Sequence, residues 1–404
     1  MTAPIRAGGH ASRFRKCIAA AQSAFTVCHG YRWDKGIMNP IPFFLGRLSG
    51  PALIIVSLLH GVLFAAFVAS LLLLAPAAAR AEEAVRCEGR DLFAELKARD
   101  PDAATEAEKA FAATPNRHGR FWQVEKEGVA PSHLFGTIHT TDPRALALPA
   151  PVEAAFGKAS TYVMEAVDVR STFSATLAMA QHPSLFVYTD GTSAFDQLTE
   201  EDGAAVRAAL ERRGVDPATA TKLKPWLIAG MLAAPPCELK RKAAGLEFLD
   251  NALADRAEEA GKAVEGLETM VEQMRALADM PMDSHIEGLA SAAELDAYAA
   301  DMTETLTIRY LNGELGLIMP ALTAIGEDLQ GELSAEDRAS VADFEEKVVT
   351  NRNHNMAEAA EPFLLKGEAF IAVGALHLPG QEGVVALLQK AGWTVTAVPL
   401  DPLR

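Results

Sequence analysis

Three common catalytic signatures are missing from this chain of 404 residues. It has no H-E-x-x-H pair, no G-x-S-x-G elbow and no G-x-x-x-x-G-K-[ST] loop, which excludes the usual zincin, α/β-hydrolase and P-loop NTPase patterns. Low-complexity linkers are also missing between residues 82 and 404. We therefore expect one domain over that range, with a site built from another pattern.

Positive charge is scarce. Lys and Arg total 37 against 53 Asp and Glu, which gives a net charge of −16. Residues 1–81 alone hold eight Lys or Arg and one acid, so the remaining residues carry a net charge of about −23. This balance argues against nucleic acid and anionic membrane surfaces as partners of residues 82–404.

The first 81 residues are unlike the rest of the chain. A basic segment precedes an almost unbroken apolar run from Pro51 to Ala79, and an A-x-A cleavage pattern ends at Ala81. This order is typical of an export signal that is cleaved after Ala81. Because the run is long enough to span a bilayer, an uncleaved membrane anchor is the alternative. Met38 would be a more ordinary start. In either case we expect the domain in the periplasm, free or tethered through residues 51–79.

Cysteine is scarce too, and Cys87 and Cys237 are the two that follow the apolar run. In an oxidising compartment two cysteines most simply pair, so we expect a disulfide between them. Two buried free thiols are the alternative. Neither cysteine lies in a Gly-rich or electropositive turn, which argues against a catalytic thiol.

Two apolar runs end in the same short motif. One leads into Gly136-Thr-Ile-His139 and the other, which begins at Ala369, leads into Gly374-Ala-Leu-His377. Such runs, bounded by charge or by Pro and Gly, indicate buried strands. A glycine there lets another backbone or a ligand approach closely, and each histidine then lies at the rim of a sheet, where open α/β folds bind ligands.

Four more segments have strand patterns, and long helical patterns lie between them. The segments are residues 121–125, which form a hairpin with 133–135, and residues 161–165, 263–268 and 393–398. The second and third of these end on the carboxylates Glu165 and Glu268. We therefore predict a single α/β domain over residues 82–404, with a central mixed sheet built from two similar halves and a large helical insertion.

The ordered set of motifs resembles the TraB/GumN family, which also includes the TIKI-type proteases. The resemblance covers about residues 120–400 and rests on these segments: Leu134-Phe-Gly-Thr-Ile-His139, Tyr162-Val-Met-Glu165, Lys224-Pro-Trp226, Gly245-Leu-Glu-Phe-Leu-Asp250, Gly266-Leu-Glu-Thr-Met-Val-Glu-Gln273, Asn351-Arg-Asn353 and Phe370-Ile-Ala-Val-Gly-Ala-Leu-His-Leu-Pro-Gly380. It implies an α/β fold in which the two G-x-x-H histidines and a glutamate form a divalent-metal site. In the TIKI branch such a site supports peptide-bond hydrolysis.

His139, Glu165 and His377 accordingly form a predicted metal-ligand set at three strand ends. Imidazole and carboxylate ligands suit Zn, Mn, Co or Fe better than Ca or Mg, and the resemblance favours Mn or Co. Glu268 is then either the general base or an acceptor that orients one of the histidines.

Arg352 and Asn353 are expected on a helix that faces this site. Arg352 can bind a substrate carboxylate or, with Asn353, stabilise an oxyanion. The alternative is that Arg352 pairs with Glu165 or Glu268 and neutralises two acids that would otherwise repel each other.

The leading functional hypothesis is an extracytoplasmic metal-dependent hydrolase, in particular a peptidase acting on small peptides or an exported protein. The alternative is a non-catalytic protein that binds and sequesters a peptide or small signalling molecule, a role that the pheromone-inhibiting members of the family imply. A third hypothesis is an envelope assembly factor whose site is structural. The two histidines, two carboxylates, Arg and Asn at strand or helix ends favour the hydrolase, because a binding protein has little need of a general base.

Overall fold

The computed structural model describes residues 87–400. The export signal or anchor predicted within residues 1–81 lies outside the described residues. Over residues 87–400, no helix is both long enough and apolar enough to cross a membrane.

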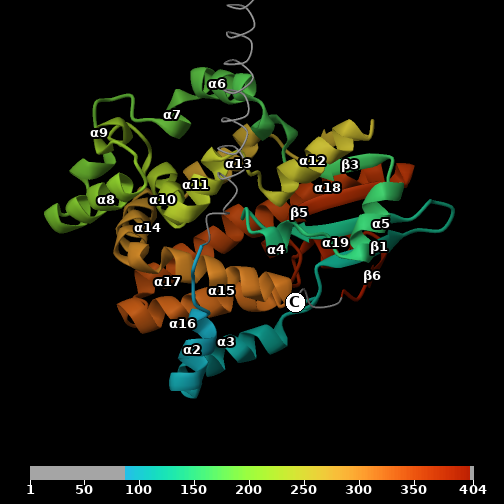
Figure 1. Cartoon of the computed structure of the whole chain (residues 1–404), viewed down its shortest axis with the longest axis horizontal. Coiled ribbons are helices and arrows are strands. Elements are labelled where there is room, and N and C mark those ends of the chain that lie inside the picture. Colours follow the sequence, from blue (N-terminus) through green and yellow to red (C-terminus); the bar gives the residue numbers. More distant parts are fainter. Residues whose placement is uncertain (1–86, 401–404) are drawn as a thin grey trace, which may run out of the picture. The chain divides into compact units, whose positions relative to one another are not determined.

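One mixed sheet of six strands forms the centre of the fold (Figure 1). Its order is β4-β3-β5-β2-β1-β6, and the strands are β1 (Phe121–Glu125), β2 (Ser132–Thr137), β3 (Thr161–Met164), β4 (Ala263–Gly266), β5 (Ala369–Gly374) and β6 (Thr394–Ala397). Strands β4, β3, β5 and β2 are parallel, whereas β1 is antiparallel to both β2 and β6. The predicted α/β fold with a mixed sheet is confirmed. The two strands that lead into G-x-x-H, β2 and β5, are parallel neighbours.

Helices fill most of the connections, and the largest helical insertion lies between β3 and β5. Before β1 come α2 (Leu92–Arg99) and α3 (Pro101–Ala113), and between β2 and β3 come α4 (Pro143–Leu146) and α5 (Ala150–Lys158). Between β3 and β4 lie η1 (Val167–Arg170), α6 (Thr172–Gln181), α7 (Pro183–Phe186), η2 (Ala194–Asp196), α8 (Glu200–Arg212), α9 (Pro217–Ala220), α10 (Pro225–Ala233), α11 (Pro236–Ala243) and α12 (Leu249–Glu259).

The segment between β4 and β5 ends in two consecutive helices of different type, a π-helix and an α-helix. Its elements are α13 (Met270–Ala278), α14 (Met282–Glu294), η3 (Leu295–Tyr298), α15 (Ala299–Leu311), η4 (Leu315–Leu317), α16 (Ile318–Gln330), α17 (Ala335–Phe344), the π-helix η5 (Glu345–Thr350) and α18 (Asn351–Lys366). After β5 come a 3-10 turn, η6 (Ala375–His377), and α19 (Val384–Lys390). Helices α18 and η6 each begin at the carboxyl edge of the sheet.

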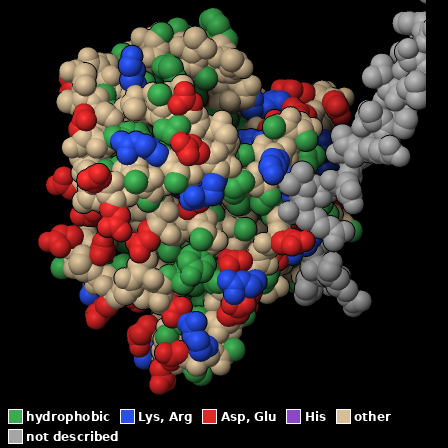
Figure 2. Space-filling view, turned by 60° about the vertical axis from the view of Figure 1, so that its left-hand side comes forward, with side chains coloured by type: hydrophobic (Ala, Val, Ile, Leu, Met, Phe, Trp, Pro, Cys, Tyr) green, Lys and Arg blue, Asp and Glu red, His purple; other side chains and the backbone are tan. Residues whose placement is uncertain are grey.

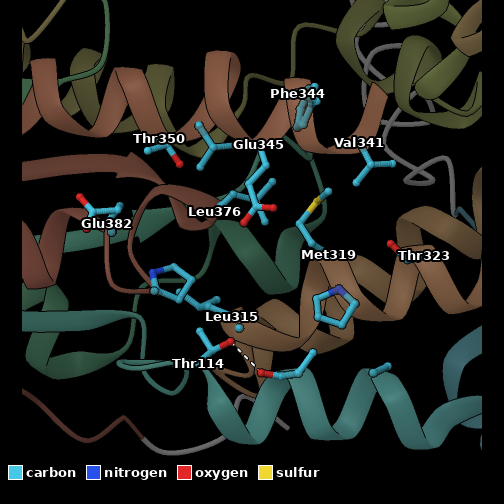
Figure 3. A pocket seen from close by; sticks show the side chains of 18 of the residues that line it. Thr114, Leu315, Met319, Thr323, Val341, Phe344, Glu345, Thr350, Leu376 and Glu382 are labelled. Carbon is cyan, nitrogen blue, oxygen red and sulfur yellow. Dashed lines mark hydrogen bonds between the residues drawn. The ribbon is translucent and has the colours of Figure 1, made fainter. Parts of the chain in front are cut away.

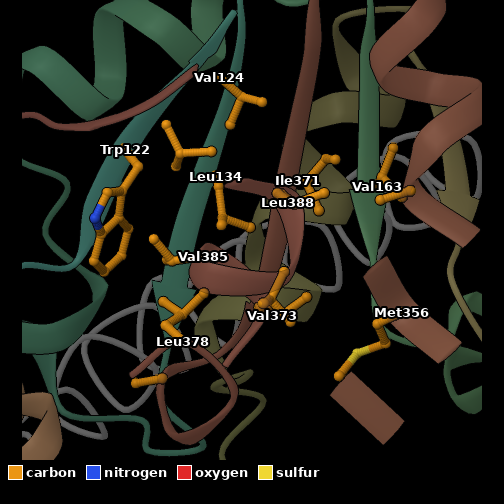
Figure 4. Close-up of a cluster of buried hydrophobic side chains, with 14 of the residues drawn as sticks. Trp122, Val124, Leu134, Val163, Met356, Ile371, Val373, Leu378, Val385 and Leu388 are labelled. Carbon is orange, nitrogen blue, oxygen red and sulfur yellow. The ribbon is translucent and has the colours of Figure 1, made fainter. Parts of the chain in front are cut away.

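Both faces of the sheet are buried. Successive side chains on a strand point to opposite sides, so each strand contributes apolar side chains to both faces. One face packs against α18 and α19 and the other against α5 and α12, as the close-up of the first face shows (Figure 4). The alternation places one member of each of these pairs on each face: Phe121 and Trp122, Leu134 and Phe135, Tyr162 and Val163, Phe370 and Ile371. Each such fully buried side chain contributes about 1.5–3 kcal/mol, so the sheet is a rigid base for residues at its edge.

Strand β4 is shorter than the sequence predicts, because it ends at Gly266 and not at Glu268. The chain turns back there onto the end of β3. The N–H of Leu267 donates to Met164 O at 3.0 Å, and the N–H of Glu268 donates to Glu165 O at 2.8 Å. The turn therefore brings Glu268 beside Glu165.

A disulfide joins Cys87 to Cys237, with their Cα atoms 5.4 Å apart, which confirms the predicted pairing. It ties the start of the described chain to α11, 150 residues later. Cross-linking so long a loop restricts the unfolded chain strongly.

Candidate functional site

The two motif glycines bring β2 and β5 to a common edge. A Cβ at Gly374 would lie 3.0 Å from Oε1 of Glu165, and a Cβ at Gly136 would lie 2.7 Å from the Leu378 side chain. Gly374 also donates its backbone N–H to Glu165 Oε1 at 2.6 Å. Both positions therefore permit the close approach that the sequence predicts, and at Gly374 the approaching group is a predicted metal ligand.

Glu165 follows β3 and is buried at the centre of the site. Its Oε2 accepts from Arg352 Nη2 at 2.6 Å and from Gln273 Nε2 at 3.0 Å. Burial would raise the pKa of this carboxyl, but the surrounding charges and the Gly374 amide lower it to about 2. Glu165 is therefore ionised at neutral pH.

His377 closes η6, and it is buried and neutral at pH 7. Burial lowers its pKa to about 4, although the Glu165 carboxylate opposes that effect. Its Nδ1 lies 2.6 Å from Oδ1 of Asn353, an acceptor, which places the proton on Nδ1. The Nε2 lone pair then faces the site, 3.7 Å from Glu165 Oε1 and 3.3 Å from Arg352 Nη1.

Arg352, in the first turn of α18, connects the two predicted carboxylates. It pairs with both Glu165 and Glu268. Its Nη2 and Nε contact Oε1 of Glu268, and Nε also lies 3.2 Å from Oε2 of the same residue. Gln273 supports the same pair, because its Nε2 donates to Glu165 Oε2 and, at 2.9 Å, to Glu268 Oε1. The charge-neutralising role that the sequence left open for Arg352 is thus present in the structure.

Asn353 is 2% exposed and both ends of its amide are engaged. Its Oδ1 contacts His377 Nδ1, and its Nδ2 donates to the backbone oxygen of Glu382 at 2.9 Å. These contacts orient His377. They give Asn353 a contact that positions His377, and its oxyanion contact stays a prediction.

His139 lies apart from this group. Its side chain is 64% exposed and stacks on Phe248, with ring centroids 5.6 Å apart. Its Nε2 lies 3.9 Å from Oδ2 of Asp250, and that buried oxygen has no hydrogen-bond partner among the described residues. Burial raises the pKa of Asp250, while His139 and a 2.6 Å hydrogen bond from Thr137 oppose the rise.

Five of the six predicted site residues therefore lie together in the structure, and His139 lies outside their cluster. Glu165, Glu268, Arg352, Asn353 and His377 form a connected buried cluster, and His139 acts electrostatically on both Glu165 and His377 without touching either. In the part of the chain from 87 to 400, no three His, Cys, Asp or Glu side chains are placed so that they could hold a metal ion together.

Two residues of the site have no predicted role from sequence. Asp250 lies in the first turn of α12 and Gln273 lies on α13. Both lie within segments that carry the family resemblance, but an Asp or Gln inside a helical pattern gives no sign of burial by itself. Asp250 is buried and Gln273 is half-buried because α12 and α13 pack at the carboxyl edge of β3 and β4.

These features define a class of α/β proteins with a buried charged centre at the carboxyl edge of a mixed sheet, built on two parallel strands that each lead into G-x-x-H. The chain belongs to the TraB/PrgY/gumN family, since the model of that family matches residues 120–397. Searches of curated proteins and of solved structures found no match to the chain.

Proposed function

We propose that this protein is an extracytoplasmic metal-dependent hydrolase that acts on peptides. The observation that carries the proposal is the cluster of Glu165, Glu268, Arg352 and His377, which buries two carboxylates and a neutral imidazole at one sheet edge. Buried titratable groups with shifted pKa values concentrate at functional sites.

The donor chemistry of the site fits a divalent ion, although the atoms are not in a ligating arrangement. Glu165 is ionised, His377 presents a neutral Nε2, and Oδ2 of Asp250, which has no hydrogen-bond partner among the described residues, lies 3.9 Å from Nε2 of His139. A carboxylate or carbonyl behind a ligating histidine is the usual way to fix its tautomer. We therefore propose His139, Glu165 and His377 as ligands of Mn, Co or Zn, with Asp250 and Asn353 as the groups that orient the two histidines.

A divalent ion at such a site supplies a bound water acidic enough to ionise near neutral pH. The chain's own residues have three further tasks. Glu268 offers Oε2, which only Arg352 contacts among the described residues, as the atom that accepts a proton. Arg352 pairs with both carboxylates, and it would bind a substrate carboxylate or an oxyanion by releasing one of its present partners. Asn353 holds the His377 ring.

One observation favours the second candidate, a non-catalytic binding protein. Arg352 already pairs with both Glu165 and Glu268, so each buried carboxylate has a cationic partner without a metal. In that case the site would capture a peptide carboxylate through Arg352 and would cleave no bond.

Metal content of the purified full-chain protein tests the proposal directly. We expect about one Mn, Co or Zn per chain after incubation with excess ion, and none in the double variant His139→Ala/His377→Ala, which should keep its circular dichroism spectrum. Glu268→Gln should retain the metal and lose peptide hydrolysis. A protein that takes up no ion even in excess would exclude the hydrolase and leave the binding protein as the better hypothesis.

The extracytoplasmic location is part of the same proposal. It rests on the signal or anchor pattern in residues 1–81 and on the Cys87–Cys237 disulfide, because such bonds persist mainly in oxidising compartments. Fractionation of cells that express the full chain, followed by N-terminal sequencing, distinguishes a cleaved periplasmic form from an anchored one. Recovery of the intact chain in the cytosol would exclude both.

A further inference from the structure

A cavity of about 730 Å³ lies beside the charged cluster. Helices α3 and α16, the π-helix η5 and the loop after η6 form its walls, as the close-up shows (Figure 3). Its volume falls within the range of about 300–1,000 Å³ that is usual for ligand sites. The roles assigned above to the charged cluster do not use this cavity.

The cavity adjoins the cluster through α18 and η6. Asn353 lines it with its buried amide, which contacts His377, and Leu376 lines it one residue before that histidine. Three wall residues, Glu345, Val349 and Thr350, belong to the π-helix that precedes the turn of α18 carrying Arg352. π-Helical turns are rare and occur frequently at functional sites. A ligand in the cavity would therefore lie against the helix turn that carries Arg352 and Asn353.

The lining combines apolar side chains with carboxylates and contains no Lys or Arg. Met319, Val341, Phe344 and Leu376 supply apolar surface, and Val341 is one of the exposed large hydrophobic residues of the described chain, at 37%. The carboxylates are Glu106, Glu327, Glu345 and Glu382.

The four carboxylates differ in their partners. Glu106, Glu327 and Glu382 each pair with a surface cation, at 2.6 Å to Lys109, 3.7 Å to Arg338 and 2.9 Å to Lys390. Glu345 forms no ion pair within residues 87–400. Its negative charge is available to a ligand.

The wider surroundings are acidic as well. Residues 318–350, which form one wall, contain eight Asp or Glu and two Lys or Arg. In the space-filling view, acidic side chains gather over the lower half of the face, toward the end of the molecule that carries α2 and α3 (Figure 2). Such a field attracts cations and repels anions.

We infer that this cavity binds a peptide segment in which apolar side chains are flanked by Lys or Arg, and that it selects such peptides for the proposed hydrolase. The apolar walls remove leucine-like side chains from water, and Glu345 and Glu327 face the flanking cations. The inference about turnover rests on the proposed function, whereas the inference about binding does not.

Binding of short peptides to the full-chain protein tests this selectivity. The probe is a blocked, fluorescently labelled tetrapeptide with two leucines between two lysines. One control peptide has glutamates in place of the lysines, and the other has serines in place of the leucines. We expect the first peptide to bind at least tenfold more tightly than either control, with an affinity that falls as salt increases. Equal binding of all three peptides would overturn the inference.

Two variants locate the binding. Val341→Trp fills the cavity and should weaken binding at least tenfold, whereas Val169→Trp, at a 41% exposed valine outside the lining, should leave it unchanged. The double variant Glu327→Gln/Glu345→Gln should weaken binding about threefold to tenfold. Its control is Glu332→Gln, which removes an 85% exposed carboxylate outside the cavity. Equal effects of each variant and its control would place the peptide elsewhere.

The two proposals fail in different ways. Selective binding that depends on Val341, without hydrolysis in the presence of Mn, Co or Zn, supports the cavity inference and removes the hydrolase. Hydrolysis that is indifferent to Val341→Trp and to the lysines removes the cavity inference and leaves the hydrolase intact.

Discussion

Replacing Arg352 with Met tests whether one guanidinium holds the acid cluster together. Methionine keeps a long side chain in place but leaves Glu165 and Glu268 without their shared cation. Their side chains are only 10% and 4% exposed, so water cannot take over that role. Removing one partner from a buried ion pair costs about 3–5 kcal/mol. We expect the free energy of unfolding of Arg352→Met to fall by about that amount at pH 7.

The loss should depend on pH in a defined direction. Without Arg352, the pKa of the Glu165 carboxyl rises, because burial opposes ionisation and one of the lowering charges is gone. A higher folded-state pKa reduces the stability that the ionised Glu165 contributes at pH values above its unfolded-state pKa. The wild-type protein meanwhile loses the stability that its low-pKa Glu165 provides as pH falls from about 4.5 toward 2. The difference between variant and wild type should therefore shrink on acidification.

Urea unfolding followed by tryptophan fluorescence, in the presence of a chelator at pH 7 and at about pH 3, measures both effects, because the lower pH lies between the unfolded-state and folded-state pKa of Glu165. Arg338→Met is the matched control, because that arginine is 55% exposed and its carboxylate contacts are 3.7 and 3.5 Å. Exposed pairs contribute about 0–1 kcal/mol, so the control should lose little. A loss for Arg352→Met no larger than the control, or one that is the same at both pH values, would refute the charge-cluster argument.

Three further outcomes are expected. Asp250→Asn should raise the melting temperature of the metal-free protein at pH 7, because burial raises the pKa of Asp250 and one of its oxygens has no hydrogen-bond partner among residues 87–400. The gain should shrink as pH falls toward about 4, and a lower melting temperature at pH 7 would contradict this. His377→Gln should flatten the fall in stability between about pH 6.5 and 4, where the unfolded chain protonates this residue and the fold does not, as urea titrations in chelator would show. Cys87→Ser should cost about 2–4 kcal/mol under oxidising conditions and nothing under reducing ones; equal melting temperatures in both would contradict a stabilising disulfide.

The strands and the residues at the carboxyl edge of the sheet could be predicted, because the strand patterns and the motif glycines indicate the same strand ends. Apolar runs and alternating patterns indicated the strands, and Gly136 and Gly374 marked two places where a side chain approaches the backbone closely. Glu165 directly follows its strand, so its position at the rim followed from the strand boundary. Glu268 was harder, since β4 ends two residues earlier than predicted and a backbone turn carries the carboxylate to Glu165.

The remaining contacts depend on packing between distant segments. Whether Arg352 binds a substrate or two carboxylates is decided by how α18 meets the ends of β3 and β4, and both roles fit the same sequence. His139 follows β2 by two residues, so no strand register fixes its ring, and it lies exposed against Phe248. Asp250 is buried because α12 packs its first turn beside Thr137, a contact across 113 residues of sequence.

Arg352 occupies the atoms of Glu165 and His377 that a metal ion would need as ligands. An ion held by Glu165 and His377 would have to share those atoms with a guanidinium that already contacts both. Because the two cations would repel each other, an ion would bind there only if Arg352 turned toward Glu268 alone or if His139 approached and added a ligand. In the first case Arg352 and Glu268 would stay paired, and Glu165 and His377 would be free to act as ligands. In a binding protein no such movement is required, and Arg352 would keep both carboxylates when a peptide is bound.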